Sequence, residues 1–203
     1  MKFESEIRNL LIENTIRAVA EGGFEKATVK ELAHTGDPIP GVKMNDVYVY
    51  RLFGSKEELY RAAFTRLDNE LFDALRSTYS AIGGIEGSRR EKMYELFLGM
   101  WDFILKKPER LRSYVRYYYS VYFPGQSSAE HNKRFRGLLG GIASMFKAEA
   151  DVNAIMHSVF IMLLDFSIRV LNGELENSEV NVPHIFNVLY CMMLTYFDES
   201  VTV

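Results

Sequence analysis

The sequence has little cysteine: Cys191 is the only one among 203 residues, so no disulfide can form within the chain. No apolar run approaches the ~20 residues that span a bilayer, and the first residues, MKFESEIRNLL, lack the apolar stretch of a signal peptide. These absences predict a soluble, cytoplasmic protein without a membrane partner, in a reducing compartment. Cys191 lies inside the apolar segment VLYCMML, where we expect an ordinary core residue.

An excess of positive charge, which nucleic-acid-binding proteins usually carry, is also missing. The chain has 24 Lys and Arg against 27 Asp and Glu, a formal net charge of -3. Residues 1–60 alone hold eight cationic and ten anionic side chains. We therefore expect any affinity for DNA that does not depend on its sequence to be weak.

Segments that alternate strictly between apolar and polar residues, as half-buried strands do, are absent. Apolar residues instead recur at helical spacing along nearly the whole chain, which predicts an all-α fold. The expected helices cover residues 7–22, 28–34, 45–53, 55–82, 88–105, 108–122, 128–149, 152–171 and 181–197.

Motifs for catalysis are missing as well. The four histidines are scattered, no Cys or His pair has metal spacing, and neither a phosphate-binding glycine loop nor a nucleophile elbow occurs. We expect no metal, no cofactor and no enzymatic activity.

What the sequence does contain is a set of clear helix boundaries near the N-terminus. Gly22 and Gly23 can close the first helix, because glycine adopts the left-handed conformation readily. Thr28 is followed three residues later by a glutamate, and so is Ser55, the spacing of a capping box that begins a helix. Phe24 is expected to turn back into the core.

Two of these segments, GGFEKATVKELA (22–33) and YRLFGSKEEL (50–59), resemble the N-terminal domain of the TetR (tetracycline-repressor) family over residues 7–64. The resemblance implies a three-helix helix-turn-helix DNA-binding domain at 1–54. It also implies a helical ligand-binding and dimerisation domain at 55–203, whose first helix, 55–82, connects the two. The implied function is a ligand-responsive transcriptional regulator, a repressor, that binds a palindromic operator in double-stranded DNA as a homodimer and responds to a small-molecule effector.

The residues that would contact DNA follow from the same resemblance. Helix starts bind phosphate through their free amides, and the exposed side of the third helix can face base edges. Thr28, Tyr50, Ser55 and Lys56 are assigned to phosphates, and Lys43, Asn45, Asp46 and Tyr48 to the recognition surface. Without DNA, the two hydroxyls would simply cap helices, Tyr50 would be core and Lys56 a solvated charge.

Three departures from the family bear on DNA binding. GDPIPG (36–41) adds about six residues between the second and third helices, Asp46 places a carboxylate near the phosphates, and Leu52 stands where the family usually has an aromatic residue. The insertion costs little in folding, because doubling a loop adds only ~0.6 kcal/mol. The alternative function is therefore a dimeric ligand- or protein-binding helical module that has lost DNA binding.

Aromatic, methionine and isolated polar side chains in the C-terminal part form a candidate ligand site, since such side chains adapt to apolar ligands. Asp165 and Arg169 are four residues apart and could instead pair along their helix. If Asp165 faces a cavity, a cationic ligand follows. The candidates, most of which could also be core, are Phe97, Trp101, Tyr117, Tyr118, Tyr122, His157, Phe160 and Asp165.

The last two expected helices are apolar on nearly all sides, so each must bury more than one face. Such a pair commonly packs against its copy in an isologous four-helix interface, and the alternative is a monomer core. The residues assigned to this homodimer interface are Val159, Leu163, Ile185, Leu189, Met192 and Met193.

Overall fold

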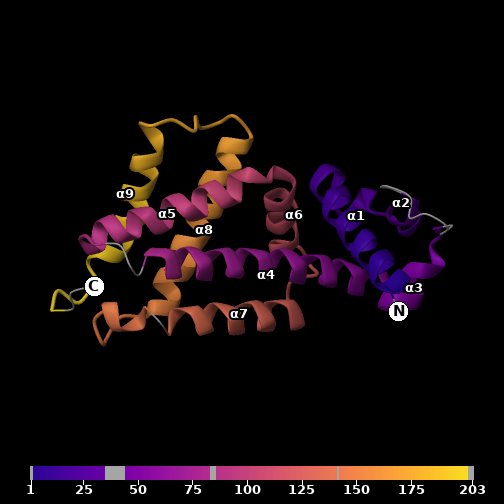
Figure 1. The fold of residues 1–203 in the computed structure, drawn as a ribbon, viewed down its shortest axis with the longest axis horizontal. Helices are drawn as coiled ribbons and strands as arrows, with labels where there is room; N and C mark the ends of the chain where they lie inside the picture. Colours follow the sequence, from indigo (N-terminus) through magenta and orange to yellow (C-terminus); the bar gives the residue numbers. More distant parts are fainter. Residues whose placement is uncertain (1, 35–43, 83–85, 141, 201–203) are drawn as a thin grey trace. The chain divides into compact units, whose positions relative to one another are not determined.

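A computed structural model describes residues 2–34, 44–82, 86–140 and 142–200. Within these ranges every named element is a helix and no strand is present, which confirms the all-α fold (Figure 1). The elements are α1 (Lys2–Lys26), α2 (Val29–His34), α3 (Val47–Phe53), α4 (Lys56–Ile82), α5 (Arg89–Lys106), α6 (Pro108–Tyr118), α7 (Gln126–Leu139), the short 3-10 helix η1 (Ala143–Met145), α8 (Val152–Leu171) and α9 (Asn181–Leu194).

The chain divides into two compact units. Unit 1 comprises residues 1–70 and 109–130, and unit 2 comprises residues 71–108 and 131–203. The first half of α4 therefore belongs to unit 1 and its second half to unit 2. The predicted functional division near residue 54 stays a prediction.

The first three helices pack against one another within unit 1 (Figure 1). Leu11 of α1, Leu32 of α2 and Val49 of α3 are fully buried. Removing each of these side chains from water contributes roughly 1.5–3 kcal/mol. This burial of one apolar side per helix forms the three-helix bundle that the sequence predicts.

The chain turns sharply at Gly23, near the end of α1. Its φ of 72° lies in the left-handed region that favours glycine, which confirms the predicted closure. Phe24 then enters an aromatic cluster of unit 1, with its ring centroid 4.9 Å from that of Tyr60 and 4.8 Å from that of Tyr122. The predicted core role of Phe24 is confirmed.

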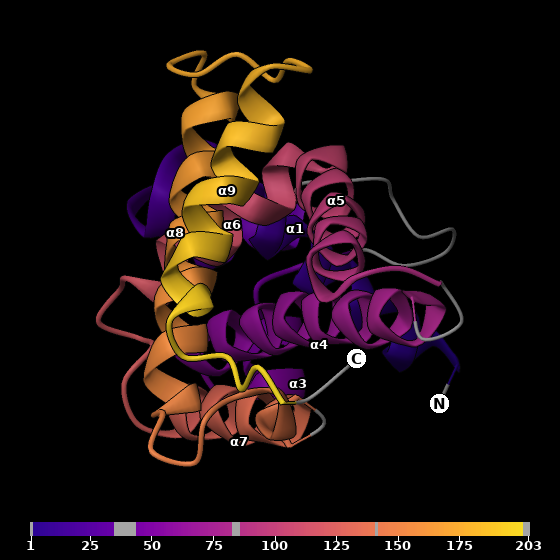
Figure 2. The same cartoon turned by 90° about the vertical axis from the view of Figure 1, so that its left-hand side faces the viewer.

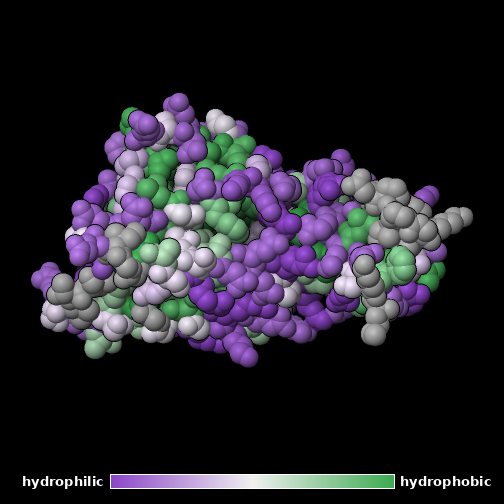
Figure 3. Space-filling model, viewed as in Figure 1, coloured by the Kyte–Doolittle hydropathy of each residue, from purple (hydrophilic) through white to green (hydrophobic). Residues whose placement is uncertain are grey.

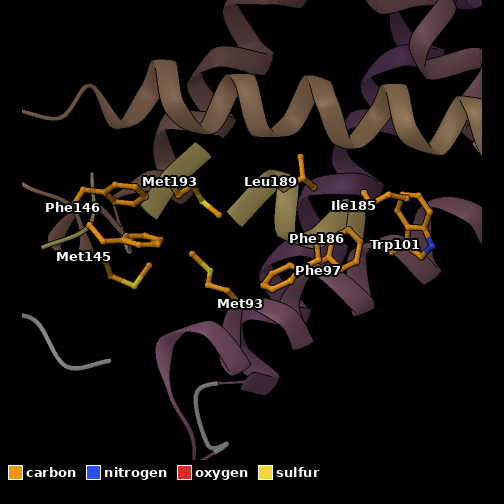
Figure 4. Packing of buried hydrophobic residues seen from close by; sticks show 10 residues of the cluster. Met93, Phe97, Trp101, Met145, Phe146, Ile185, Phe186, Leu189 and Met193 are labelled. Carbon is orange, nitrogen blue, oxygen red and sulfur yellow. The ribbon is translucent and has the colours of Figure 1, made fainter. Parts of the chain in front are cut away.

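In unit 2, helices α5, α8 and α9 contact one another, and α8 and α9 lie side by side (Figure 2). Their apolar cluster joins side chains of α5 to side chains of α9 (Figure 4). The ring centroid of Phe97 lies 5.5 Å from that of Trp101 and 5.6 Å from that of Phe186. These contacts fix the inner sides of α5 and α9.

Two predicted helices are shorter in the structure. The helix predicted over 108–122 ends at Tyr118, because the Ser120 hydroxyl donates to the Tyr117 carbonyl at 2.7 Å and accepts from the Tyr122 amide at 3.1 Å. Serine competes with the helical hydrogen bonds in this way. The helix predicted over 128–149 runs from 126 to 139 and stops before Gly140, a poor helix former.

The last helix also ends early, at residue 194 instead of 197. After a turn at 195–196, the Lys147 amide donates to the Tyr196 carbonyl and the Asp198 amide to the Met145 carbonyl, both at 2.9 Å. These bonds join residues 146 and 197 in an isolated antiparallel bridge. Backbone pairing between distant segments therefore replaces the predicted last turn.

Helix α8 is long and apolar enough to cross a membrane by length and composition, the only such helix in the ranges that the structure describes. Asp165 and Arg169 interrupt it, so it still contains no uninterrupted apolar run of that length. Only 11% of its most apolar window is buried within the chain. Most of its other residues are half-buried.

Candidate nucleic-acid interface and ligand cavity

Helix α3 is fixed to the rest of unit 1 by its inner side and its C-terminal end. Val49 is fully buried. Arg8 of α1 donates from Nη1 to the Leu52 carbonyl at 2.8 Å, and its guanidinium lies 4.4 Å from the centroid of the Phe53 ring. A charge-assisted bond and a cation–π contact from one side chain thus hold α3 against α1.

The outer side of α3 carries large side chains in solvent. Val47 is 63% exposed and Tyr50 55%, so the alternative that Tyr50 is a core residue is wrong. Arg51 is exposed and its guanidinium lies 4.7 Å from the centroid of the Tyr48 ring. Arg51 was missed by the sequence reasoning, although its position four residues after Val47 places both on one helix face.

Asn45 and Asp46 are exposed at the start of α3. The Asn45 Oδ1 accepts from the Val47 amide at 3.1 Å, so α3 begins two residues later than predicted, at 47. The Asp46 side chain makes no capping hydrogen bond. Lys43 and the predicted insertion at 36–41 lie outside the described residues.

The two predicted helix starts are formed. The Thr28 hydroxyl accepts from the Glu31 amide at 3.2 Å, and the Ser55 hydroxyl accepts from the Glu58 amide at 3.1 Å. Both hydroxyls therefore have a structural role as caps. Lys56, in the first turn of α4, is half-buried, with Nζ 5.5 Å from the centroid of the Tyr60 ring.

Tyr60 ties the start of α2 to α4. Its hydroxyl donates to the Ala27 carbonyl at 2.8 Å and approaches the Phe24 carbonyl at 3.3 Å. The side chain is fully buried, and this burial raises the pKa of the phenol far above its usual range. Since Ala27 directly precedes Thr28, this bond positions the amides that begin α2.

Unit 2 contains an apolar cavity with a volume of about 130 Å³. Of the eight predicted ligand residues, Phe97 and Phe160 line it. Its wall comes from α4, α5, α7, α8, α9 and the segment after α7, and comprises Leu71, Phe72, Leu75, Met93, Leu96, Phe97, Met100, Phe135, Ile142, Met156, Val159, Phe160, Leu163, Phe186, Leu189 and Met193.

The predicted tyrosines do not belong to this cavity. Tyr117, Tyr118 and Tyr122 lie in unit 1, where the Tyr117 ring stacks on Phe64 with centroids 4.5 Å apart. Burial raises the pKa of Tyr118 to about 12. Grouping these tyrosines with Phe97 and Phe160 around one cavity was therefore wrong, because the aromatic segment after α5 joins the core of unit 1.

The other predicted polar or amphipathic candidates are occupied elsewhere. Trp101 is buried in unit 2, and its Nε1 donates to the Asn177 Oδ1 at 3.0 Å. Asp165 is exposed and its Oδ2 accepts from the Arg169 Nε at 2.8 Å, which confirms pairing along the helix. His157 keeps part of its surface in solvent; partial burial, and next the nearby His131, lower its pKa.

Five of the six residues predicted at the dimer interface belong to the apolar cluster or the cavity wall of unit 2. Ile185 is buried in the apolar cluster and Met192 is half-buried. The other four line the cavity: Val159, Leu163, Leu189 and Met193. These five side chains pack among α5, α8 and α9, and the assignment of the whole set to a dimer interface stays a prediction.

A different stripe of α9 faces outward. Val188 is 44% exposed and Leu194 52%, and Cys191 between them is also exposed, so the core prediction for Cys191 was wrong. Three- and four-residue spacing places Val188 and Cys191 on one helix face. Figure 3 shows hydrophobic side chains reaching the surface over α8 and α9.

No group of three or more His, Cys, Asp or Glu in the described ranges could hold a metal ion. What the chain presents is a bundle in which an anchored helix exposes one face, and a second helical unit with an apolar cavity. These features are those of helix-turn-helix proteins in which the DNA-binding bundle is joined to a second helical domain of the same chain.

Comparison with solved structures identifies the family whose fold this chain shares. No family model and no curated protein matches the chain. A TetR family transcription regulator from Marinobacter aquaeolei matches with a TM-score of 0.74 at 20% identity, over 95% of this chain and 98% of that chain. The fatty acid degradation regulator FadR from Bacillus halodurans matches with a TM-score of 0.62 at 16% identity, over 90% and 93%.

A candidate transcriptional regulator from Saccharomonospora viridis, solved in complex with choline, matches with a TM-score of 0.61 at 15% identity, over 96% of this chain and all 100% of that chain. Identities this low establish the fold. The chain therefore has the fold of TetR family transcription regulators, as its sequence motifs predict.

Proposed function

We propose that the chain is a cytoplasmic, homodimeric DNA-binding transcription regulator, a repressor, that binds a palindromic operator and responds to a small molecule. The observation that supports DNA binding is the exposed outer face of α3, a helix fixed on its other side by Val49 and Arg8. A helix held in this way reads base edges in a major groove with its outer side chains. In a dimer, two copies of α3 would meet grooves one turn apart, ~34 Å.

The recognition surface comprises Asn45, Asp46, Tyr48 and the newly found Arg51, which are exposed or half-buried on or before α3. Asp46 suits a cytosine amino group, whereas phosphate would repel it. The arginine is the side chain that most often contacts guanine. Lys43 is retained as a proposed contact.

Phosphate contacts would come from the helix starts. The first amides of α4 carry the partial positive charge of a 27-residue helix, and Lys56 adds a full charge beside them. Because Thr28 and Ser55 already cap their helices, their contribution would come through the neighbouring backbone amides. The Tyr50 hydroxyl is exposed and free to reach a phosphate in the complex.

The test is a titration of fragments from the upstream region of its own gene at several salt concentrations. Lys56→Ala should weaken binding to all fragments alike and lower the salt slope by about one, whereas the control Lys106→Ala should not. Tyr50→Ala should weaken binding, and Tyr119→Ala, an equally exposed tyrosine of unit 1, should not. No salt-dependent binding to any fragment would reject the DNA-binding proposal.

Dimerisation would cover the outer surface of α8 and α9. Val188, Cys191 and Leu194 form an exposed apolar stripe beside the little-buried α8, and two such pairs can form an isologous four-helix interface. A second copy suits this surface better than a membrane, because the charged pair Asp165–Arg169 lies in the second half of α8.

Sedimentation of Val188→Glu and Leu194→Glu tests the interface. Two buried carboxylates per copy should convert the dimer to monomer, because an unpaired charge is costly to bury. Val121→Glu, at the most exposed apolar residue of unit 1, should leave the dimer intact. Wild-type protein that sediments as a monomer at micromolar concentration would reject the dimer.

The response to a ligand would pass through α4. This helix begins beside α3 in unit 1, and its residues Leu71, Phe72 and Leu75 line the cavity in unit 2. A ligand that prefers one position of α4 shifts the population of the DNA-binding state by its preference for that state. We propose that ligand binding lowers the affinity for the operator.

The second candidate function is a dimeric helical module that binds ligands or proteins but not DNA. The net charge of -3 and the exposed Asp46 favour it. The same titration distinguishes the two: ligand binding together with no affinity for DNA at low salt would support the module.

A further inference from the structure

The cavity in unit 2 is lined entirely by apolar side chains. Its wall consists of five phenylalanine rings, four methionine side chains and seven aliphatic side chains, and contains no charged or hydrogen-bonding side chain. Moving a charged group into such a space without a partner is far more costly than moving a neutral one. The lining therefore selects against carboxylates and phosphates, which find no partner in it.

The polar side chains near the cavity do not change this conclusion. His131 is fully buried and its ring lies 5.5 Å from that of Phe72, 5.9 Å from that of Phe160 and 6.1 Å from that of Phe135, centroid to centroid. It packs against three lining rings without being part of the wall. Asp165, the carboxylate that could have held a cation, is exposed and bound to Arg169.

Volume sets the size of the ligand. An apolar cavity of about 150 Å³ stays dry and accommodates a single benzene ring. The cavity here, at about 130 Å³, is of that order. A long acyl chain does not fit unless the wall moves, although four flexible methionines in the wall, Met93, Met100, Met156 and Met193, allow modest adjustment.

We infer that this cavity binds an uncharged apolar molecule of about the size of one aromatic ring. The inference rests on the ligand-responsive part of the function proposed above and gives that ligand a chemical class. Neither the hydroxyl of choline nor the carboxylate of a fatty acid would find a hydrogen-bonding side chain in this wall.

Titration calorimetry on the full-length chain without DNA tests the inference, with toluene, choline and octanoate as probes. Toluene should bind saturably with one site per chain, and the two charged probes should not. Tighter binding of choline or octanoate than of toluene would overturn the inference, as would the absence of saturable toluene binding.

A pair of variants on α8 shows whether toluene occupies this cavity. Val159→Phe adds a ring to a lining position and should weaken toluene binding at least tenfold. Val170→Phe adds the same ring on the same helix outside the wall and should leave binding within twofold. Equal affinities in the two variants would place the bound toluene elsewhere and overturn the assignment.

A second pair changes the selectivity. Phe97 and Phe146 are both buried in one apolar cluster, but only Phe97 lines the cavity. Phe97→Leu should enlarge the cavity and raise the affinity for naphthalene relative to toluene at least fivefold. Phe146→Leu should leave the ratio unchanged, which separates a change of cavity shape from a general loss of stability. Similar ratios in both variants would contradict the role of Phe97.

Failure of this inference can be distinguished from failure of the proposed regulator. Toluene binding without any DNA binding keeps the cavity assignment and rejects the regulator. DNA binding without toluene binding does the reverse. If both proposals hold, toluene should weaken operator binding by the wild type and should not affect operator binding by Val159→Phe.

Discussion

Replacing Tyr60 by phenylalanine removes one buried hydroxyl from unit 1 and leaves the ring in place. That hydroxyl donates to the Ala27 carbonyl at 2.8 Å, and it lies 3.3 Å from the Phe24 carbonyl. Tyr60 and Ala27 are both fully buried. Water therefore cannot replace the lost donor, and the variant should leave the Ala27 carbonyl without its bond.

The expected cost follows from this geometry. Leaving a buried acceptor unsatisfied costs about 1–3 kcal/mol, and the longer approach to Phe24 adds little. The ring contacts with Phe24 and Tyr122 remain, so no cavity term is added. For a chain of about this size each kcal/mol lowers Tm by roughly 2–4 °C, so the variant should melt about 2–12 °C lower.

Thermal and urea unfolding followed by circular dichroism measure this cost. Tyr119→Phe is the matched control, because it removes the same hydroxyl from an exposed side chain of unit 1 and should shift the midpoints by less than ~0.5 kcal/mol. If Tyr60→Phe and Tyr119→Phe unfold at the same temperature and urea concentration, then Tyr60 does not tie α2 to α4 and the account of unit 1 given above is wrong.

Two further predictions concern a cation on α1 and a histidine on α8. Arg8→Ala should destabilise unit 1 by about 1–3 kcal/mol and weaken DNA binding, because it removes the hydrogen bond and the ring contact that hold α3. The control is Arg17→Ala, which removes an exposed arginine of the same helix. Equal urea midpoints for the two variants would contradict the anchoring role of Arg8. Because partial burial, and next His131, lower the pKa of His157, the unfolded chain binds a proton at a pH where the folded chain does not, so stability should fall as pH drops below about 6.5. In His157→Asn, the free energy of unfolding measured by urea titration should depend less on pH between about pH 7 and 5. An unchanged pH dependence would show that other groups cause it.

The parts of the fold that the sequence predicts well are those set by local chemistry. Thr28 and Ser55 cap helices in the structure because each hydroxyl bonds an amide three residues ahead, a contact that neighbouring residues decide. The chain turns at Gly23 because glycine, which has no Cβ, adopts a positive φ at little steric cost. These features required no knowledge of distant residues.

The orientation of α9 illustrates what the sequence could not provide. Its segment VLYCMML is apolar at every position, so helical periodicity contains no information on which side faces inward. The contacts of α9 with α5 and α8 place Leu189 and Met193 in the cavity wall and leave Val188 and Cys191 exposed. Only tertiary packing breaks the symmetry between two equally apolar faces.

The prediction that the tyrosines after α5 line the ligand cavity was wrong for a related reason. Their aromatic composition suits either a ligand site or a core, and spacing along one helix does not identify the helix against which they pack. In the structure the Tyr117 ring stacks on Phe64 and the Tyr114 ring packs against Phe64 at a tilt, and Tyr117 shares a hydrogen bond with Ser127 at 2.9 Å. Residues of α4, α6 and α7 thus form one core, a relation that no single segment of the sequence contains.

Helix α8 takes part in both the proposed ligand cavity and the proposed dimer interface, because apolar side chains occupy more than one of its sides. Val159 and Leu163 line the cavity, whereas only 11% of the most apolar window of α8 is buried within the chain. Most of its other residues are half-buried, so part of their apolar surface stays accessible. If a second copy covers it, any ligand that displaces Val159 also shifts the helix that forms the dimer interface. Val159→Phe should therefore change the dimer dissociation constant as well as toluene affinity, whereas Phe97→Leu on α5 should change only ligand selectivity. A dimer whose dissociation constant is the same in all three proteins would show that cavity and interface are energetically independent.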